Sequence, residues 1–176
     1  MSLSGTGSRG TQTVRTPRWL IERIEREFGP ITLDAAANHK NAVVPAHLGP
    51  GGIGDGLFEW PASPHIWCNP PFSAQGKFVR RAFEASLTGS AVTMLVMASI
   101  DSRWWIECVS GIADVYVLHP RIVFVGHATP FPRATAILRY PGGTRTGGAP
   151  ANGYFLHDNG ESNKEDDNAA PDTSRN

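Results

Sequence analysis

The tetrapeptide Asn69-Pro70-Pro71-Phe72 groups residue types that could do chemistry together. The Asn side-chain oxygen and the backbone carbonyl that follows it are two hydrogen-bond acceptors, and the prolines restrict the backbone that carries them. The aromatic ring beside them offers a stacking surface. Two acceptors and a flat ring suit an exocyclic amine, which has two N–H bonds and is attached to a planar base. The structural alternative is a tight Pro-Pro turn in which Phe72 is simply buried.

Helices and strands are predicted to alternate around this tetrapeptide. Apolar residues at helical spacing up to Phe28 predict a first helix, with Thr16 as its N-cap and Pro17 as its first helical residue. Further helices are predicted at 75–87 and 102–109. Strands are predicted at 31–33, 65–68, 91–98, 114–118, 122–125 and 134–140. The last two strands are expected to form a C-terminal β-hairpin with its tip at 126–133.

This alternation predicts an α/β fold in which helices cover both faces of one compact sheet. In such sheets, ligands bind beyond the carboxyl ends of the strands. Asp34, Asn69 and Asp101 each follow a predicted strand. We therefore expect these three side chains to lie along one edge of the sheet.

The folded domain is predicted to span residues 16–141. Residues 1–15 are rich in Ser, Gly and Thr and have almost nothing to bury, so a flexible leader is expected there. Residues 142–176 are expected to form a mostly disordered acidic tail. Within that tail, Tyr154-Phe155-Leu156 is a candidate docked segment.

The formal net charge of +0 conceals an uneven distribution. Residues 158–176 carry six acidic and two basic side chains, a net charge of −4, so the rest of the chain has a net charge of +4. A mildly basic body suits a polyanionic partner such as nucleic acid. We interpret the acidic tail as a solubilising segment.

Several classes of protein are excluded by composition. No run approaches the roughly 18 apolar residues that span a bilayer, and the N-terminus lacks the apolar core of a signal peptide. Cys68 and Cys108 show neither disulfide-framework nor metal-ligand spacing, and the six histidines are scattered. We therefore expect a soluble, reduced, intracellular protein without a metal.

The tetrapeptide resembles the catalytic motif of S-adenosylmethionine-dependent amino-methyltransferases, and the wider pattern resembles the phage-type DNA N6-adenine methyltransferase family. Seven stretches between about residues 16 and 140 carry this resemblance in the family's order. They are Thr16-Pro17, Leu33-Asp34-Ala35-Ala36, Gly54-Asp55-Gly56-Leu57, Trp67-Cys68-Asn69-Pro70-Pro71-Phe72-Ser73, Asp101-Ser102-Arg103-Trp104-Trp105, Arg121-Ile122-Val123-Phe124 and Phe131-Pro132.

The resemblance implies methyl transfer from S-adenosylmethionine to the N6 amine of an adenine flipped out of double-stranded DNA. It implies that Asn69 and the carbonyl of Pro70 accept hydrogen bonds from N6, that Pro71 helps to hold these acceptors, and that Phe72 stacks on the base. Neither a covalent enzyme intermediate nor a general base before attack is required. The implied location is the cytoplasm of a bacterial or phage-infected cell.

The resemblance also assigns contacts around this centre. Expected cofactor contacts are Thr16, Pro17, Asp34, Ala35, Asp55 and Asn69. Expected substrate contacts are Phe72, Ser73, Asp101, Arg121 and Phe131. Candidate phosphate contacts are Lys77, Arg80, Arg81, Arg121 and Arg133. Simpler roles remain open from the residues alone: a turn cap for Asp34, an exposed turn for Asp55, a helix cap for Asp101-Ser102, a packed loop aromatic for Phe131 and solvated surface charges for the five basic residues.

Two features depart from broader methyltransferases. Ala35-Ala36-Ala37 stands where a Gly-x-Gly loop would follow the first strand, and only about 30 residues separate Asp34 from the strand that leads to Asn69. We therefore expect a trimmed Rossmann-like sheet. With no separate recognition module, recognition of DNA would fall to residues 38–64 or 126–133.

Other functions fit the same residues. Cytosine N4, an RNA adenine or a protein glutamine could accept a methyl group by the same chemistry. A non-catalytic DNA-binding relative is a further alternative, against which the intact Asn69–Phe72 motif argues. Binding of S-adenosylmethionine separates these, since a pure DNA-binding protein does not require it.

Overall fold

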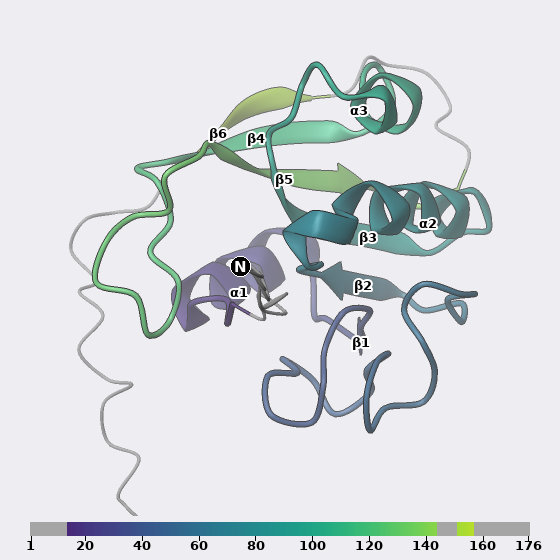
Figure 1. Cartoon of the computed structure of the whole chain (residues 1–176). Helices are drawn as coiled ribbons and strands as arrows, with labels where there is room; N and C mark the ends of the chain where they lie inside the picture. The colour runs from purple at the N-terminus through teal and green to yellow at the C-terminus, as the bar shows by residue number, and fades with distance from the viewer. Residues whose placement is uncertain (1–13, 144–150, 157–176) are drawn as a thin grey trace, which may run out of the picture.

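The computed structural model describes residues 14–143 and 151–156 (Figure 1). Its sheet has six strands in the order β1-β2-β3-β5-β4-β6. Their bounds are β1 Leu33–Asp34, β2 His65–Cys68, β3 Ala91–Met97, β4 Asp114–His119, β5 Thr135–Tyr140 and β6 Asn152–Leu156. The helices are α1 Arg18–Phe28, α2 Gln75–Leu87 and α3 Arg103–Cys108, with a short 3-10 turn at Phe72–Ala74.

Every strand except β5 runs in the same direction. The pairs β1–β2, β2–β3 and β4–β6 are parallel, whereas β5 is antiparallel to both β3 and β4. The carboxyl ends of β1, β2 and β3 therefore share one edge of the sheet with the first residue of β5. The expected α/β sheet is confirmed.

Helices cover both faces of the sheet, as predicted. On one face, α2 and α3 pack against the strands through Phe78, Val79 and Trp105. On the other face, α1 packs through Leu20 and Ile24, which are fully buried. In Figure 1, α2 lies in front of the sheet and α1 behind it.

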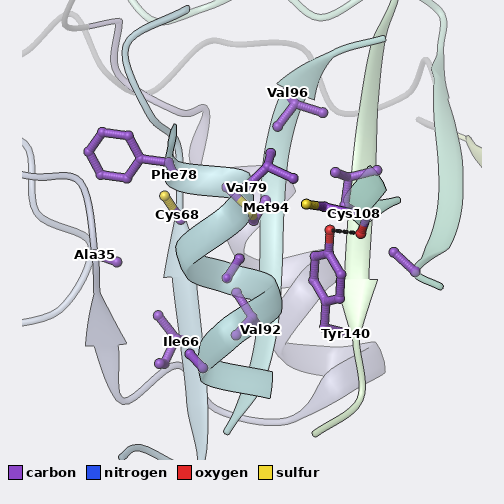
Figure 2. Close-up of a cluster of buried hydrophobic side chains, with 14 of the residues drawn as sticks. Ala35, Ile66, Cys68, Phe78, Val79, Val92, Met94, Val96, Cys108 and Tyr140 are labelled. Atoms are coloured by element: carbon purple, nitrogen blue, oxygen red, sulfur yellow. Dashed lines mark hydrogen bonds between the residues drawn. The ribbon is translucent and has the colours of Figure 1, made fainter. Parts of the chain in front are cut away.

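Strand β3 shows why its apolar run forms the centre of the fold. Val92 and Met94 point toward α2 and α3, and Leu95 packs in the cluster on the α1 face. A strand covered on both faces needs apolar residues at both alternating positions. Figure 2 shows the α2 side of this core, where the hydroxyl of Tyr140 donates a 2.8 Å hydrogen bond to the carbonyl oxygen of Cys108.

The predicted start of the first helix is wrong by one residue. Helix α1 begins at Arg18, Pro17 occupies the cap position, and no side chain caps the helix there. The hydroxyl of Thr16 instead accepts a hydrogen bond from Asn69. The predicted end is correct, because Gly29 follows the helix with a φ of 89°.

The predicted hairpin is also wrong in its first strand. Strand β5 pairs with β4 and β3, and residues 122–125 form a loop with one bridge, from Val125 to Arg15. Ile122 and Phe124 are buried in the α1-side core. The alternating burial that resembles a strand therefore comes from a loop that packs its apolar side chains under the sheet.

The candidate docked segment is confirmed as strand β6, which pairs with β4. The flexible leader and most of the acidic tail were predicted for residues that fall outside those described, apart from Val14 and Arg15 at the start and 142–143 and 151–156 at the end. In the described part of the chain, no helix is long and apolar enough to cross a bilayer.

The connection between β1 and β2 adds no helix and no further strand to the sheet, as the expectation of a trimmed sheet implied. Residues 35–64 contain no helix or extended strand, only an isolated bridge from His47 to Asp34. This segment packs closely on the end of β1 at Gly56. A Cβ added to Gly56 would lie 2.1 Å from the carbonyl oxygen of Ala35 and 2.9 Å from the ring of Phe78.

We predict that Gly56→Ala lowers the free energy of unfolding by about 1–3 kcal/mol, because backbone atoms must move to admit one methyl group. Gly54→Ala is the matched control in the same loop, since its Cβ would meet only Leu48, at 3.4 Å. Urea denaturation of both variants measures the difference. Equal stability of the two would show that the loop does not pack on β1 as described.

Candidate active site

The carboxyl ends of β1 and β2 bring Asp34 and Asn69 together at one edge of the sheet. Asp34 is the last residue of β1 and pairs in register with Trp67 of β2, and Asn69 directly follows β2. Pro70 and Pro71 come next and carry no N–H with which to continue the ladder. The chain therefore leaves the sheet there and turns into the 3-10 segment that contains Phe72.

The side-chain amide of Asn69 is fixed in one orientation. Its Nδ2 donates hydrogen bonds to the carbonyl oxygen of Val14 at 3.1 Å and to the hydroxyl of Thr16 at 3.0 Å. A carbonyl oxygen can only accept, so the NH2 group must face Val14. Asn69 Oδ1 is consequently directed elsewhere. It is buried and has no hydrogen-bond partner.

A second acceptor lies next to this oxygen along the chain. No described residue donates a hydrogen bond to the carbonyl of Pro70, whereas the carbonyl of Pro71 accepts one from the backbone of Ala74 at 2.8 Å. The bond from Ala74 holds the turn that follows the two prolines. The sequence prediction of two fixed, available acceptors agrees with this arrangement.

Phe72 lies in an aromatic cluster with two residues of the loop between β4 and β5. Its ring centroid is 4.8 Å from that of Phe131 and 6.1 Å from that of Phe124. Phe72 is 9% exposed, so Phe131 covers much of the surface on which a base would stack. Of the two roles given to Phe131 by the sequence, the packed loop aromatic is what this contact shows, and the substrate contact stays a prediction.

Arg121 supports this loop from its start. Its Nη1 donates a 3.1 Å hydrogen bond to the carbonyl of Pro132, next to Phe131. Arg121 itself is exposed, which leaves its other N–H groups facing outward. Of the candidate phosphate contacts on α2, Arg80 pairs with Glu107, and Arg81 pairs with Glu84 on its own helix.

Two neighbouring cavities lie beside Thr16, and Asn69 itself lines only the smaller one. The smaller has a volume of about 10 Å³, and its wall includes Asp34, Ala36 and Asn69. The larger has a volume of about 370 Å³, within the size range of small-ligand sites. The two adjoin, because both are lined by Thr16 and Asn41.

Charges of both signs line the larger cavity. Arg15 and Lys40 supply positive charge, and Glu22 and Glu25 supply negative charge from α1. Glu25 also accepts a 3.1 Å hydrogen bond from the backbone of Ile31, which orients its carboxylate. A wall of this kind matches a zwitterionic ligand, such as one that carries an amino-acid group.

Asp34 is a buried carboxylate that organises the loop after β1. Its two oxygens accept hydrogen bonds from the backbone N–H of Ala36 at 3.2 Å and of Val43 at 3.1 Å. Burial raises the pKa of Asp34 to about 6, although both hydrogen bonds and the nearby His47 oppose that shift. The turn-cap role is therefore present, and the carboxylate also faces the smaller cavity.

The structure does not bring all predicted cofactor contacts to these cavities. Ala35 is buried in the core on the α2 face, and it is Ala36 that lines the smaller cavity. Asp55 is exposed and accepts a 2.9 Å hydrogen bond from the backbone of Leu57, as a turn aspartate does. Pro17 is the N-cap residue of α1 and lines neither cavity.

Sequence reasoning missed Val14, Asn41 and Val43. Val14 provides the carbonyl that orients Asn69, and the other two lie in the walls of both cavities. None of the three stands in a recognisable motif. Their roles depend on which loops fold back over the end of β1.

Two predicted substrate contacts are exposed near the same edge. Asp101 lies in the turn after β3, and Ser73 directly follows Phe72. The predicted cap at Asp101-Ser102 is correct in position, since Ser102 is the N-cap residue of α3, but no side chain forms a capping bond there. Ser102 instead donates a 2.6 Å hydrogen bond to the carbonyl of Ser99. Within the described ranges, no group of three His, Cys, Asp or Glu residues is arranged to hold a metal ion.

A comparison with protein families identifies the family of this chain. A family model described as DNA N-6-adenine-methyltransferase (Dam) matches residues 4–135, about three quarters of the chain. The chain belongs to this family. The match includes Thr16, Asp34 and the Asn69–Phe72 motif.

Two phage proteins are similar to this Dam-family chain. A DNA N-6-adenine-methyltransferase of Escherichia phage T1 is 31% identical over 120 residues, which cover 64% of this chain and 50% of that protein. One from Haemophilus phage HP1 (strain HP1c1) is 29% identical over 132 residues, which cover 73% of this chain and 75% of that protein. This chain therefore matches half of the T1 protein and three quarters of the HP1 protein.

A solved structure of a predicted O-methyltransferase from Agrobacterium tumefaciens is 18% identical to this chain. The matched region covers 52% of this chain and 40% of the O-methyltransferase, with a TM-score of 0.30. That score is too low to carry an argument about the site.

The raised pKa of Asp34 predicts a pH-dependent cost to stability. The unfolded carboxyl releases its proton near pH 3.8, whereas the folded one holds it up to about pH 6. Folding therefore loses stability as the pH rises between these values, by about 3 kcal/mol in total. The Asp34→Asn variant lacks this titration.

Denaturation at pH 4 and pH 7 measures this effect in both proteins. The stability of Asp34→Asn relative to wild type should rise by about 2 kcal/mol over that interval, because the unfolded carboxyl is already more than half ionised at pH 4. A constant difference between the two proteins would show that Asp34 is not held in a desolvated state.

Proposed function

We propose that this chain transfers a methyl group from S-adenosylmethionine to the N6 amine of an adenine flipped out of double-stranded DNA. The observation that carries the proposal is the buried, unpartnered Oδ1 of Asn69, beside the available carbonyl of Pro70. A buried acceptor without a partner is destabilising by about 1–3 kcal/mol. A substrate that donates two hydrogen bonds from one nitrogen removes that cost.

The chain's own residues then align and polarise the amine. Asn69 Oδ1 and the Pro70 carbonyl each accept a hydrogen bond from the N6 amine. These two bonds draw the nitrogen lone pair out of conjugation with the ring. S-adenosylmethionine supplies a methyl group on a sulfonium sulfur, so that the N–C bond forms as the S–C bond breaks and the amine loses a proton to solvent. Catalysis by the protein consists of alignment and fixed dipoles.

The aromatic cluster provides the place for the flipped base. The base stacks on Phe72 once Phe131 has moved away from it, and Phe131 can then cover the opposite face. Residues 126–130 of this loop are exposed, so few buried contacts oppose that movement. Arg121 anchors the start of the loop, and its exposed N–H groups are available to DNA phosphates.

The cofactor is assigned to the larger cavity, because the smaller one has room for no more than a water molecule. Asp34 lines the adjoining smaller cavity, from which its carboxylate would favour the cationic end of S-adenosylmethionine. The charged walls of the larger one, with Arg15 and Glu25, suit its amino-acid group. The relatives are named DNA N-6-adenine-methyltransferases, which supports the same assignment.

The deciding experiment is methyl transfer from labelled S-adenosylmethionine to unmethylated double-stranded DNA, with nucleoside digestion and mass spectrometry. Wild type should produce N6-methyladenine, and Asn69→Ala should produce none, because the first acceptor is missing. Circular dichroism and cofactor titration of Asn69→Ala establish that fold and cofactor binding are retained.

The other outcomes of this assay are equally informative. Label on cytosine N4 would keep the reaction and correct the base. Binding of S-adenosylmethionine without labelling of DNA would redirect the assay to RNA and protein. Absence of both label and cofactor binding would contradict the proposed enzyme and favour a DNA-binding protein.

Thr16 is predicted to act on turnover by positioning Asn69. Thr16→Val removes one of the two acceptors that hold the Asn69 NH2 group and should lower kcat about 3- to 10-fold, the effect of one neutral hydrogen bond. Thr16→Ser keeps the hydroxyl and should stay near wild type. A raised KM for S-adenosylmethionine with unchanged kcat would instead make Thr16 a cofactor contact.

A further inference from the structure

Thr135 carries a second unpartnered oxygen at the same edge of the sheet. It is the first residue of β5, is 1% exposed, and its hydroxyl makes no hydrogen bond. Among the described residues, only three buried side-chain polar atoms lack a partner, and the others belong to Asn69 and His47. A buried hydroxyl without a partner is rare in a native fold and requires a reason.

Strand direction places Thr135 near the catalytic motif. Because β5 runs antiparallel to β3, Thr135 pairs in register with Met97, the last residue of β3. The carboxyl end of β2, which leads to Asn69, lies on the other side of β3. Asn69, one residue past the end of β2, and Thr135, the first residue of β5, therefore lie at the same edge on opposite sides of β3.

Both side chains also lie on the α1 face. Side chains alternate along a strand, and Ile137, two residues after Thr135, packs in the α1-side cluster. Trp67, two residues before Asn69, packs in the same cluster, as do Phe72 and Phe131. The two unpartnered oxygens thus share one face and one edge with the rings proposed to hold the base.

The spacing suits an adenine between them. Two strand spacings of about 9.5 Å, combined with a register offset of two residues along β3, separate the backbones of Asn69 and Thr135 by about 12 Å. Two hydrogen bonds of about 2.9 Å and the roughly 4 Å from N6 across the six-membered ring to N3 together span roughly 10 Å. N3 lies opposite the carbon that bears N6, and it is a hydrogen-bond acceptor.

We propose that the hydroxyl of Thr135 donates a hydrogen bond to N3 of the flipped adenine, at the opposite end of the base from Asn69. This inference rests on the proposed function. Phe131, four residues earlier in the chain, covers the cluster until the base enters, and Thr135 becomes accessible as that ring moves. The hydroxyl is left unpartnered in the free protein because its partner belongs to the substrate.

The test compares duplexes that carry adenine or 3-deazaadenine at the site that wild type methylates. Loss of N3 should lower kcat/KM of wild type about 3- to 10-fold, the size of one neutral hydrogen bond. Thr135→Val should show the same loss on adenine and no further loss on 3-deazaadenine. Thr135→Ser should retain the wild-type preference for adenine.

Stability provides an independent readout. Thr135→Val removes an unpartnered hydroxyl, so its thermal midpoint should stay equal to that of wild type or rise. Thr93→Val is the matched control, since Thr93 is equally buried but its hydroxyl bonds His65 at 2.9 Å. That variant should lose stability while it keeps the wild-type response to 3-deazaadenine.

Failure of this inference is distinguishable from failure of the proposed function. If wild type methylates adenine and 3-deazaadenine duplexes equally, Thr135 does not contact N3. The same conclusion follows if Thr135→Val retains the full preference for adenine. If wild type methylates no adenine in any DNA, the proposed function fails and this inference fails with it. The wild-type comparison does not depend on whether any variant folds.

Discussion

The two hydrogen bonds from the Asn69 amide to Val14 and Thr16 determine what the site can do. They use both amide hydrogens and so leave Oδ1 as a directed, buried acceptor. Both partners lie just before α1, in a segment that is bridged to Val125 of the loop between β4 and β5. The orientation of one side chain therefore depends on α1 packing on one face of the sheet and on that loop closing beside it. Those are the same elements that enclose Phe72.

Polar groups that weaken the fold gather at this one edge. Asp34 is buried with its pKa raised to about 6, and Asn69 and Thr135 each keep an oxygen without a partner. Among the other described residues, only the Nε2 of His47 is a buried side-chain polar atom without a partner, and groups such as His65 are paired, here with Gly29 and Thr93. A fold selected only for stability would favour apolar replacements at such positions. Their concentration at the edge of the sheet that holds the carboxyl ends of β1, β2 and β3 is what a preorganised binding site requires.

The sequence was sufficient where local chemistry decides the structure. The apolar run of β3, the Pro-Pro exit after β2 and the docking of β6 were each predictable from residue types. It failed where distant contacts decide. Thr16 satisfies every local rule for a helix cap, yet its partner is 53 residues away. The choice between Ala35 and Ala36 as a wall of the cavity depends on the register of a two-residue strand, which no periodic pattern can set.

The contact between Phe72 and Phe131 connects the free protein to the proposed reaction. An aromatic surface that waits for a base would be unfavourable if it were exposed to water. In this structure the two rings bury each other, with their centroids 4.8 Å apart. A flipped base that enters between them replaces the contact between the rings with one contact to each ring. Once the base is bound, the movement of Phe131 has therefore exposed little apolar area. Unstacking a base costs a few kcal/mol. New contacts to both rings, together with donors for Asn69 and Pro70, offset that cost only for a planar base that carries an amine.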